Sequence, residues 1–156
     1  MSMADTIVLM EKGAICQEAA PEVMYADPQH IFTAQFIGTP PMNMVKTTDE
    51  NLCYGFRPEA VRMTGQKTQD ILSLRATIVT REMLGSETNY QMATSLGRFM
   101  VKSACAALGA DGQPLYINVD LEHLYIFSGE GYRIQPYFNN FGEYVSRIER
   151  CIHENA

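Results

Sequence analysis

The chain has 156 residues, of which 46% are hydrophobic and 19% are charged, and its formal net charge is −6. This composition indicates a globular protein and excludes a disordered chain. The acidic balance, without a cluster of lysine and arginine, argues against nucleic acid or an anionic membrane surface as a partner. Because no apolar run approaches the roughly 18 residues of a membrane span, we expect a soluble cytoplasmic protein.

The first segment, residues 1–38, is expected to begin with a β-hairpin. Residues 7–10 form a short apolar run, residues 11–13 (Glu-Lys-Gly) suit a tight turn, and residues 14–17 form the returning strand.

Two short helices are predicted after the hairpin. Pro21 suits the first helical position, where a missing N–H costs nothing, and residues 22–25 continue that helix. The second helix is predicted to begin at Asp27-Pro28 and to run to Phe36, with Gly38 at its end. Residues 39–50 are expected to be a linker.

From about Leu52 the apolar residues alternate, which is typical of strands. The alternating runs after the strand Cys-Tyr-Gly-Phe are residues 72–78, 90–94, 99–101, 115–119 and 124–126. Phe127 is expected on the face opposite Leu124 and Ile126. Five or six short strands separated by turns predict a small antiparallel barrel or sandwich over residues 51–135. A closed barrel is favoured because it leaves no exposed strand edge.

The tail, residues 136–156, returns to helical spacing. Val145, Ile148 and Ile152 recur at i, i+3 and i+7. This pattern predicts an amphipathic helix that packs on the barrel or on a second subunit.

Motifs for catalysis are absent from the sequence. It contains no GxxxxGK[ST], GxGxxG, HExxH or GxSxG. The cysteines lack the spacing of a zinc site and are expected to be reduced thiols; they are Cys16, Cys53, Cys105 and Cys151. The histidines are expected at the surface or at strand edges; they are His30, His123 and His153. We therefore predict no catalytic residue, no metal ligand and no cofactor in this chain.

Arg57-Pro58-Glu59 is the most distinctive charged motif, a pair of opposite charges around a rigid proline directly after a strand. The simpler interpretation, which spacing alone favours, is a turn with a surface ion pair worth about 0–1 kcal/mol. The other interpretation is an interface or a contact that docks one domain on another.

Three stretches together resemble a known family. Residues 2–45 (SMADTIVLMEKGAICQEAAPEVMYADPQHIFTAQFIGTPPMNMV) resemble the end of the nucleotide-binding domain in ABC importer ATPases of the maltose and glycerol-phosphate type. Residues 55–63 (GFRPEAVRM) resemble the segment that opens the family's C-terminal regulatory domain. Residues 84–92 (LGSETNYQM) and 119–134 (VDLEHLYIFSGEGYRI) look like later strands of that domain. In the family this domain is an OB-like barrel called TOBE.

The resemblance implies that residues 1–38 are the last part of an ATP-binding domain. In the family, the Walker A loop, the signature motif, the Walker B carboxylates and the switch histidine all precede the position of Met1. ATP hydrolysis needs these groups together, so we expect no ATPase activity from this chain alone. ATP and Mg²⁺ would bind the parent subunit. Ala19-Ala20 stands where the family usually has Gly-Thr, and the tail after Pro136 has no family counterpart.

The resemblance implies a regulatory and dimerisation domain in the ATP-binding subunit of a sugar or glycerol-phosphate importer, located at the inner face of the plasma membrane. Its expected partners are a second copy, the ATPase core and the permease subunits, and such barrels can also receive a regulatory protein. The candidate interface residues are Arg57, Pro58, Glu59, Gly85, Ser86 and Glu87.

Two other functions remain open. One is a sensor of small oxyanions such as molybdate, although the sequence shows no evident basic or Ser/Thr-rich cluster for it. The other is an ATPase whose catalytic half is a separate chain. We also expect self-association, because residues 1–38 would otherwise leave apolar side chains uncovered; these are Ile7, Leu9, Phe32 and Phe36.

Overall fold

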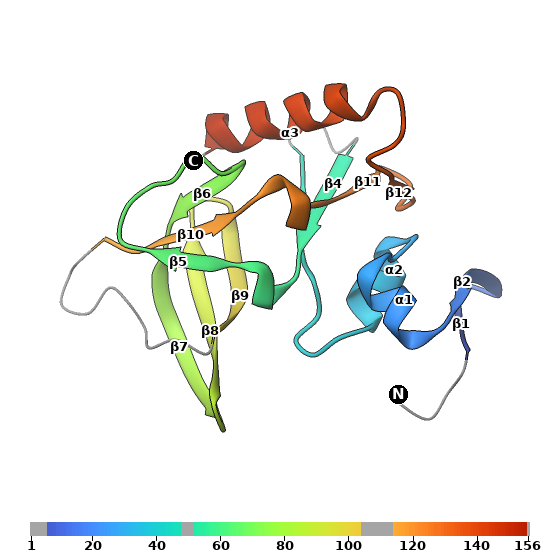
Figure 1. Ribbon diagram of the computed structural model, residues 1–156, viewed down its shortest axis with the longest axis horizontal. Helices are drawn as coiled ribbons and strands as arrows, with labels where there is room; N and C mark the ends of the chain where they lie inside the picture. The colour runs from blue at the N-terminus through green and yellow to red at the C-terminus, as the bar shows by residue number, and fades with distance from the viewer. Residues whose placement is uncertain (1–5, 48–51, 104–113, 156) are drawn as a thin grey trace.

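The protein is mainly β, as the sequence predicts. The computed structural model describes residues 6–47, 52–103 and 114–155 (Figure 1). The described strands form four small sheets, and every pairing between them is antiparallel. None of the helices in these residues has the length and apolar character needed to cross a membrane.

The N-terminal part, which we call the appendage (residues 6–38), begins with the predicted hairpin. Strand β1 (Ile7–Glu11) pairs with β2 (Ala14–Ala19). The two turn residues, Lys12 and Gly13, have φ angles of 51° and 79°. Positive φ at both central positions is the geometry that two-residue hairpin turns favour.

The two short helices of the appendage are present, but the predicted start of the second is wrong. Helix α1 (Pro21–Ala26) has proline in its first turn, as expected. Helix α2 (Ile31–Phe36) begins four residues after Asp27. Asp27 instead ends α1, where its N–H donates to Val23 O at 2.8 Å. The cap of α2 is His30, whose Nδ1 accepts from the N–H of Phe32 at 3.0 Å.

The barrel contains more strands than predicted. Nine described strands follow residue 51: β4 (Leu52–Phe56), β5 (Arg62–Thr64), β6 (Leu72–Arg75), β7 (Thr77–Leu84), β8 (Glu87–Thr94), β9 (Gly97–Ser103), β10 (Tyr116–Val119), β11 (Tyr125–Ser128) and β12 (Arg133–Ile134). The run at residues 72–78 was expected as one strand. It divides because Ala76 N bonds to Leu115 O, and the chain then changes from one sheet to another.

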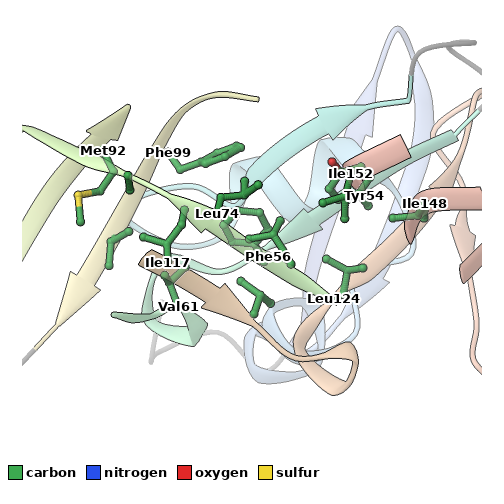
Figure 2. Packing of buried hydrophobic residues seen from close by; sticks show 14 of the residues in the cluster. Tyr54, Phe56, Val61, Leu74, Met92, Phe99, Ile117, Leu124, Ile148 and Ile152 are labelled. Carbon is green, nitrogen blue, oxygen red and sulfur yellow. The ribbon is translucent and has the colours of Figure 1, made fainter. Parts of the chain in front are cut away.

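The sheets surround one hydrophobic core. Three of the four sheets form the barrel, and their strand orders are β5-β10-β6, β12-β11-β4-β3 and β7-β8-β9. Strand β3 runs over Asn43–Lys46. Figure 2 shows side chains from all three sheets meeting in this core, among them Tyr54, Ile117 and Met92.

Helix α3 (Phe141–Asn155) packs on the barrel, as one of the two predicted arrangements requires. Ile148 and Ile152 are 0% and 2% exposed and belong to the main core. Figure 1 shows the helix lying across one end of the barrel.

A second, smaller core lies between the appendage and the barrel. Phe127 does lie opposite Ile126, but it is fully buried because this face of β11 is covered. This second core consists of four buried residues: Ala34 of α2, Met42, Cys53 and Phe127. The two parts of the chain therefore share apolar contacts.

The division into residues 1–38, 39–50, 51–135 and 136–156 stays a prediction. Strand β3 falls within the expected linker and pairs with β4 along its whole length. In the appendage, Leu9 was expected to need cover, but it is buried against Met24 and Ile37, while Phe36 is 62% exposed.

Candidate functional site

The junction between the appendage and the barrel is centred on Arg57. This residue follows β4 and precedes a short 3-10 helix, Pro58–Ala60. Arg57 is only 4% exposed, so the prediction that it forms a surface ion pair is wrong. The guanidinium donates instead to three backbone carbonyl oxygens of the appendage: Nη1 to Ala34 O at 2.9 Å, Nη1 to Ile37 O at 2.7 Å and Nη2 to Tyr25 O at 3.0 Å.

These three carbonyls explain how a buried cation is tolerated. They lie at the C-terminal ends of α1 and α2, where helices carry partial negative charge and unpaired carbonyls. Burial lowers the pKa of Arg57 below its ordinary value. The Nε of Arg57 is buried without a partner in the described residues. Arg57 therefore acts as a C-terminal cap shared by two helices.

The backbone at Gly38 lets the guanidinium approach. Gly38 has φ of +109°, and a Cβ there would lie 3.2 Å from both Arg57 Nη1 and Tyr25 Cε2. The Tyr25 ring covers Arg57, with 4.2 Å between the guanidinium carbon and the ring centroid. Glycine satisfies both the positive φ and the close approach.

A second contact between the two parts involves Arg133 and Asp27. Arg133 Nη1 donates to Asp27 Oδ1 at 2.9 Å, and Gln135 Nε2 donates to the same oxygen at 3.0 Å. The Arg133 guanidinium also lies 4.5 Å from the centre of the Tyr125 ring. Burial lowers the pKa of Arg133, although Asp27 opposes that effect.

Backbone hydrogen bonds continue this contact along the chain. Ile31 N donates to Gly131 O and Arg133 N donates to Gln29 O, both at 2.9 Å. The hydroxyl of Tyr125 donates to Ala26 O at 2.9 Å. Because two of these bonds join main-chain atoms, the geometry of the junction depends more on the backbone than on the identity of individual side chains.

A pocket of about 290 Å³ opens at the junction. Two aromatic residues, Tyr25 and Tyr125, line it together with Arg57, Glu59 and His123. The pocket therefore lies where any change in the position of α1 against the barrel would alter its shape.

The structure separates the six predicted interface residues into two groups. Pro58 is buried and Glu59 exposed, beside Arg57 at the junction. Gly85 and Ser86 form the exposed turn between β7 and β8, which Figure 1 places away from α1 and α2. Glu87 begins β8 and pairs with Lys102 at 3.2 Å. Their role between subunits stays a prediction.

Sequence reasoning missed Asp27, Arg133 and Gln135. Asp27 was assigned to a helix start, and its partners lie 106 and 108 positions away. No local spacing links such residues, so only the fold brings them together.

Each of the three histidines contacts a neighbouring residue through a ring nitrogen. His123 is exposed and bonds to Asp120 at 2.6 Å, and His153 lies 4.0 Å from Glu149. His30 is half-buried and close to Glu11 and Cys16, with possible ligand atoms within 4.8 Å of one another. Its Nδ1 accepts a backbone hydrogen bond, so the neutral ring carries its proton on Nε2. A metal bound at either nitrogen would need this arrangement to change.

The cysteines in the described residues are thiols outside any disulfide, as expected from the sequence. They are Cys16, Cys53 and Cys151, while Cys105 lies outside the described residues. Burial raises the pKa of the Cys53 thiol, and Lys46 partly opposes this. Cys53 is therefore an unreactive packing residue of the junction.

Comparison with known proteins places this geometry in a family context. The TOBE domain family matches residues 54–127. Over 151 aligned residues the chain is 25% identical to the sn-glycerol-3-phosphate import ATP-binding protein UgpC of Brucella abortus (strain 2308), covering 86% of this chain and 43% of the relative.

Two further relatives give the same result. UgpC 1 of Rhizobium johnstonii, another sn-glycerol-3-phosphate import ATP-binding protein, is 26% identical, with 91% of this chain and 46% of the relative covered. The ABC transporter ATP-binding protein YcjV of Escherichia coli O6:H1, described as uncharacterized, is 27% identical, with 83% and 43% covered.

The chain thus spans less than half the length of these relatives. The matched residues run from β4 to β11, the strands that surround the core, and they include Arg57 and Tyr125. Residues 54–127 are therefore a TOBE domain, and the chain is similar over most of its length to the C-terminal part of ABC importer ATP-binding subunits.

Proposed function

We propose that this chain is the regulatory and dimerisation part of an importer's ATP-binding subunit, serving the uptake of sugars or glycerol phosphate. The observation that carries the proposal is the junction at Arg57. One side chain of the TOBE domain there holds the ends of both appendage helices.

The contacts at the junction suit a domain that responds to movement of the appendage helices. The appendage resembles the end of an ATP-binding domain, and α1 and α2 are short helices that contact the barrel through a few defined bonds. Movement of these helices would be transmitted to the TOBE domain through Arg57 and the Arg133–Asp27 pair. The catalytic groups for ATP hydrolysis would come from an ATP-binding domain, which in turn would contact permease subunits.

Uptake measurements test this function. A strain lacking the gene for this chain is compared with the same strain carrying the wild-type gene, using radiolabelled glycerol 3-phosphate and maltose in separate assays. We expect uptake of one of these to fall and to be restored by the wild-type gene. Restoration by an Arg98→Gln variant, altered at an exposed residue of β9, is the control.

An Arg57→Leu variant made at normal abundance is expected to restore uptake only in part. Unchanged uptake of both substrates after gene deletion would contradict the proposed transport role. The 5′ genomic sequence is a second test, because an adjoining frame for an ATP-binding domain is expected.

A further inference from the structure

Three side chains that can bind a metal ion come together in the appendage. Glu11 ends β1, Cys16 lies within β2, and His30 precedes α2. Each offers one ligand atom, and these atoms lie within 4.8 Å of one another. Their positions in the sequence do not have the spacing of a zinc motif, so no metal ligand was expected there. The fold alone makes them neighbours.

An irregularity in the β1–β2 hairpin places Cys16 beside Glu11. The pairing of β2 with β1 passes from Gln17 directly to Ile15, which leaves Cys16 as an extra residue without a partner across the hairpin. Such β-bulges re-aim side chains and are frequent next to functional sites. The thiol of Cys16 lies 3.9 Å from Glu11 Oε2. A thiol and a carboxylate therefore face each other at nearly the separation of two ligands on one metal ion.

The third side chain, His30, is held between the appendage and the barrel. Its ring packs edge-to-face on Tyr132, with 5.3 Å between the ring centroids. A Cβ at Gly131 would lie 2.8 Å from His30 Nε2, so only glycine leaves room for the ring there. The ring is thus fixed beside Cys16 and Glu11 before any ligand arrives, which lowers the entropic cost of binding.

The charge and the chemistry of the group suit a zinc ion. A carboxylate at Glu11 and a thiolate at Cys16 balance the two positive charges of the ion. All three residues are half-buried, and Glu11 forms no salt bridge within the part of the chain that the structure describes. Sulfur and imidazole ligands favour zinc over magnesium and calcium, which prefer oxygen.

We propose that Glu11, Cys16 and His30 bind one Zn²⁺ ion, with water as the fourth ligand. Three protein ligands and one open position are a common arrangement for zinc. On binding, Cys16 releases its thiol proton to solvent, and its sulfur coordinates the ion as a thiolate. The site does not depend on the transport role proposed above.

Zinc binding and the cap of α2 compete for the His30 ring. Nδ1 accepts from Phe32 N at 3.0 Å in the metal-free chain. A metal on Nδ1 replaces this bond, and a metal on Nε2 moves the ring proton to Nδ1, where it faces the N–H of Phe32. Either way Phe32 loses its acceptor, which lowers the zinc affinity by about fivefold. Zinc binding is therefore coupled to the start of α2, the helix whose other end is bound by Arg57.

Metal titrations of the full chain test the site. Co²⁺ bound by a thiolate gives a strong sulfur-to-metal absorption band, and Zn²⁺ is expected to abolish this band at one ion per chain. Competition with a chromophoric chelator gives the Zn²⁺ affinity, and Mg²⁺ is expected not to compete. Absence of the thiolate band, or of saturable Zn²⁺ binding, would overturn the proposal.

Matched variants locate the ion. Cys16→Ser and Glu11→Gln are each expected to weaken Zn²⁺ binding by at least the roughly 10–100-fold that the loss of an outer-shell partner costs. His30→Asn should weaken it as much, although an asparagine side chain can still cap α2. Cys151→Ser and His153→Asn remove the same two ligand types from α3 and should leave the affinity unchanged. Circular dichroism checks that each variant is folded. Equal affinity of wild type and Cys16→Ser would overturn the proposal.

The amide of Phe32 reports directly on His30. Its hydrogen exchange is expected to be faster with Zn²⁺ bound than without, because the N–H loses its acceptor. In Cys16→Ser, the same Zn²⁺ concentration should leave this exchange rate unchanged. Tight Zn²⁺ binding to wild type without any change at Phe32 would exclude His30 as a ligand and overturn the three-residue site.

Discussion

At the scale of single residues, the contact between the appendage and the barrel is centred on Arg57, a cation that binds no carboxylate. Arg57 is buried and satisfies backbone carbonyls at the ends of two helices. Hydrogen bonds from charged groups are stronger than neutral ones, and leaving their acceptors buried and unpaired is costly. Arg57 therefore matters more for joining the parts of the chain than its place in a turn suggests.

Replacing Arg57 tests this account of the junction. Arg57→Leu is expected to lower the free energy of unfolding by about 2–4 kcal/mol, because three carbonyl oxygens lose their donor. Arg57→Lys keeps the charge but lacks the planar fork, and an intermediate loss is expected. Urea unfolding followed by circular dichroism gives these values.

The matched control is Arg98→Leu. Arg98 is exposed on β9 and has no ion pair in the described residues. A change within about 0.5 kcal/mol is expected there. If both leucine variants lost equal stability, the three carbonyl bonds would not explain the role of Arg57.

The sequence indicates that the Arg57 motif is unusual but does not identify its partners. Spacing shows a charged pair around Pro58, which favoured an exposed turn. The true partners are the carbonyls of Tyr25, Ala34 and Ile37, 20 to 32 positions away. Main-chain acceptors carry no sequence signal, so a buried role could not be derived from the motif.

At the scale of elements, a side-chain amide joins two sheets. Asn43 of β3 accepts from Met100 N at 2.8 Å and donates to Met100 O at 2.9 Å. These are the two bonds that a neighbouring strand would make with β9. The Asn43 amide therefore satisfies part of the β9 edge and links the β3-β4 sheet to the β7-β8-β9 sheet.

Substitution of Asn43 tests this link. Asn43→Ala is expected to cost about 1–3 kcal/mol of unfolding free energy, because a half-buried donor and acceptor at Met100 lose their partner. Asn43→Asp can accept from Met100 N, but its carboxylate faces Met100 O without a proton to donate, so at neutral pH it should be no more stable than the alanine variant.

Asn140→Ala provides the control for the amide. Asn140 is exposed, and its side-chain amide donates to the Tyr144 hydroxyl at 3.1 Å, within the same segment; its backbone carbonyl, which accepts from Glu143 N and Tyr144 N, is kept in the alanine variant. Thermal unfolding should show little change for this variant. An Asn43→Ala protein as stable as the control would mean that the two sheets are held together by the core alone.

Elements with strong periodicity were predicted well, and their junctions were not. The spacing of Ile148 and Ile152 correctly predicts α3 and its buried face. The run at residues 72–78 has one continuous alternation, yet it divides between two sheets at Ala76. Alternation reports which face is apolar, whereas the partner of each strand is set by long-range pairing.

At the scale of the whole molecule, apolar surface is exposed at several places in the described residues, and two of them are the appendage and the β7–β8 hairpin. The appendage exposes Ile15 at 60% and Phe36 at 62%, and the β7–β8 hairpin exposes Met83 at 76%. Exposed apolar groups of this size favour contact with a partner. We expect a second copy to cover one of them.

Sedimentation velocity at micromolar concentration tests self-association. Wild type is expected to be dimeric, and Met83→Glu to be monomeric if the hairpin forms the interface. Ile15→Glu makes the same change on the appendage and distinguishes the two surfaces. A wild-type monomer at these concentrations would contradict the expectation.

The central claim is that the appendage and the TOBE domain form one cooperative unit through Arg57. Native-state hydrogen exchange, measured amide by amide at increasing urea, tests it most directly. In wild type, the amides of Ala34 and Ile37 should exchange with the same opening free energy as Ile117 in the barrel core. In Arg57→Leu, the two appendage amides should lose protection while Ile117 remains protected against local opening. If Ala34 and Ile37 already opened independently of the barrel in wild type, and Arg57→Leu did not change them, the claim would be contradicted.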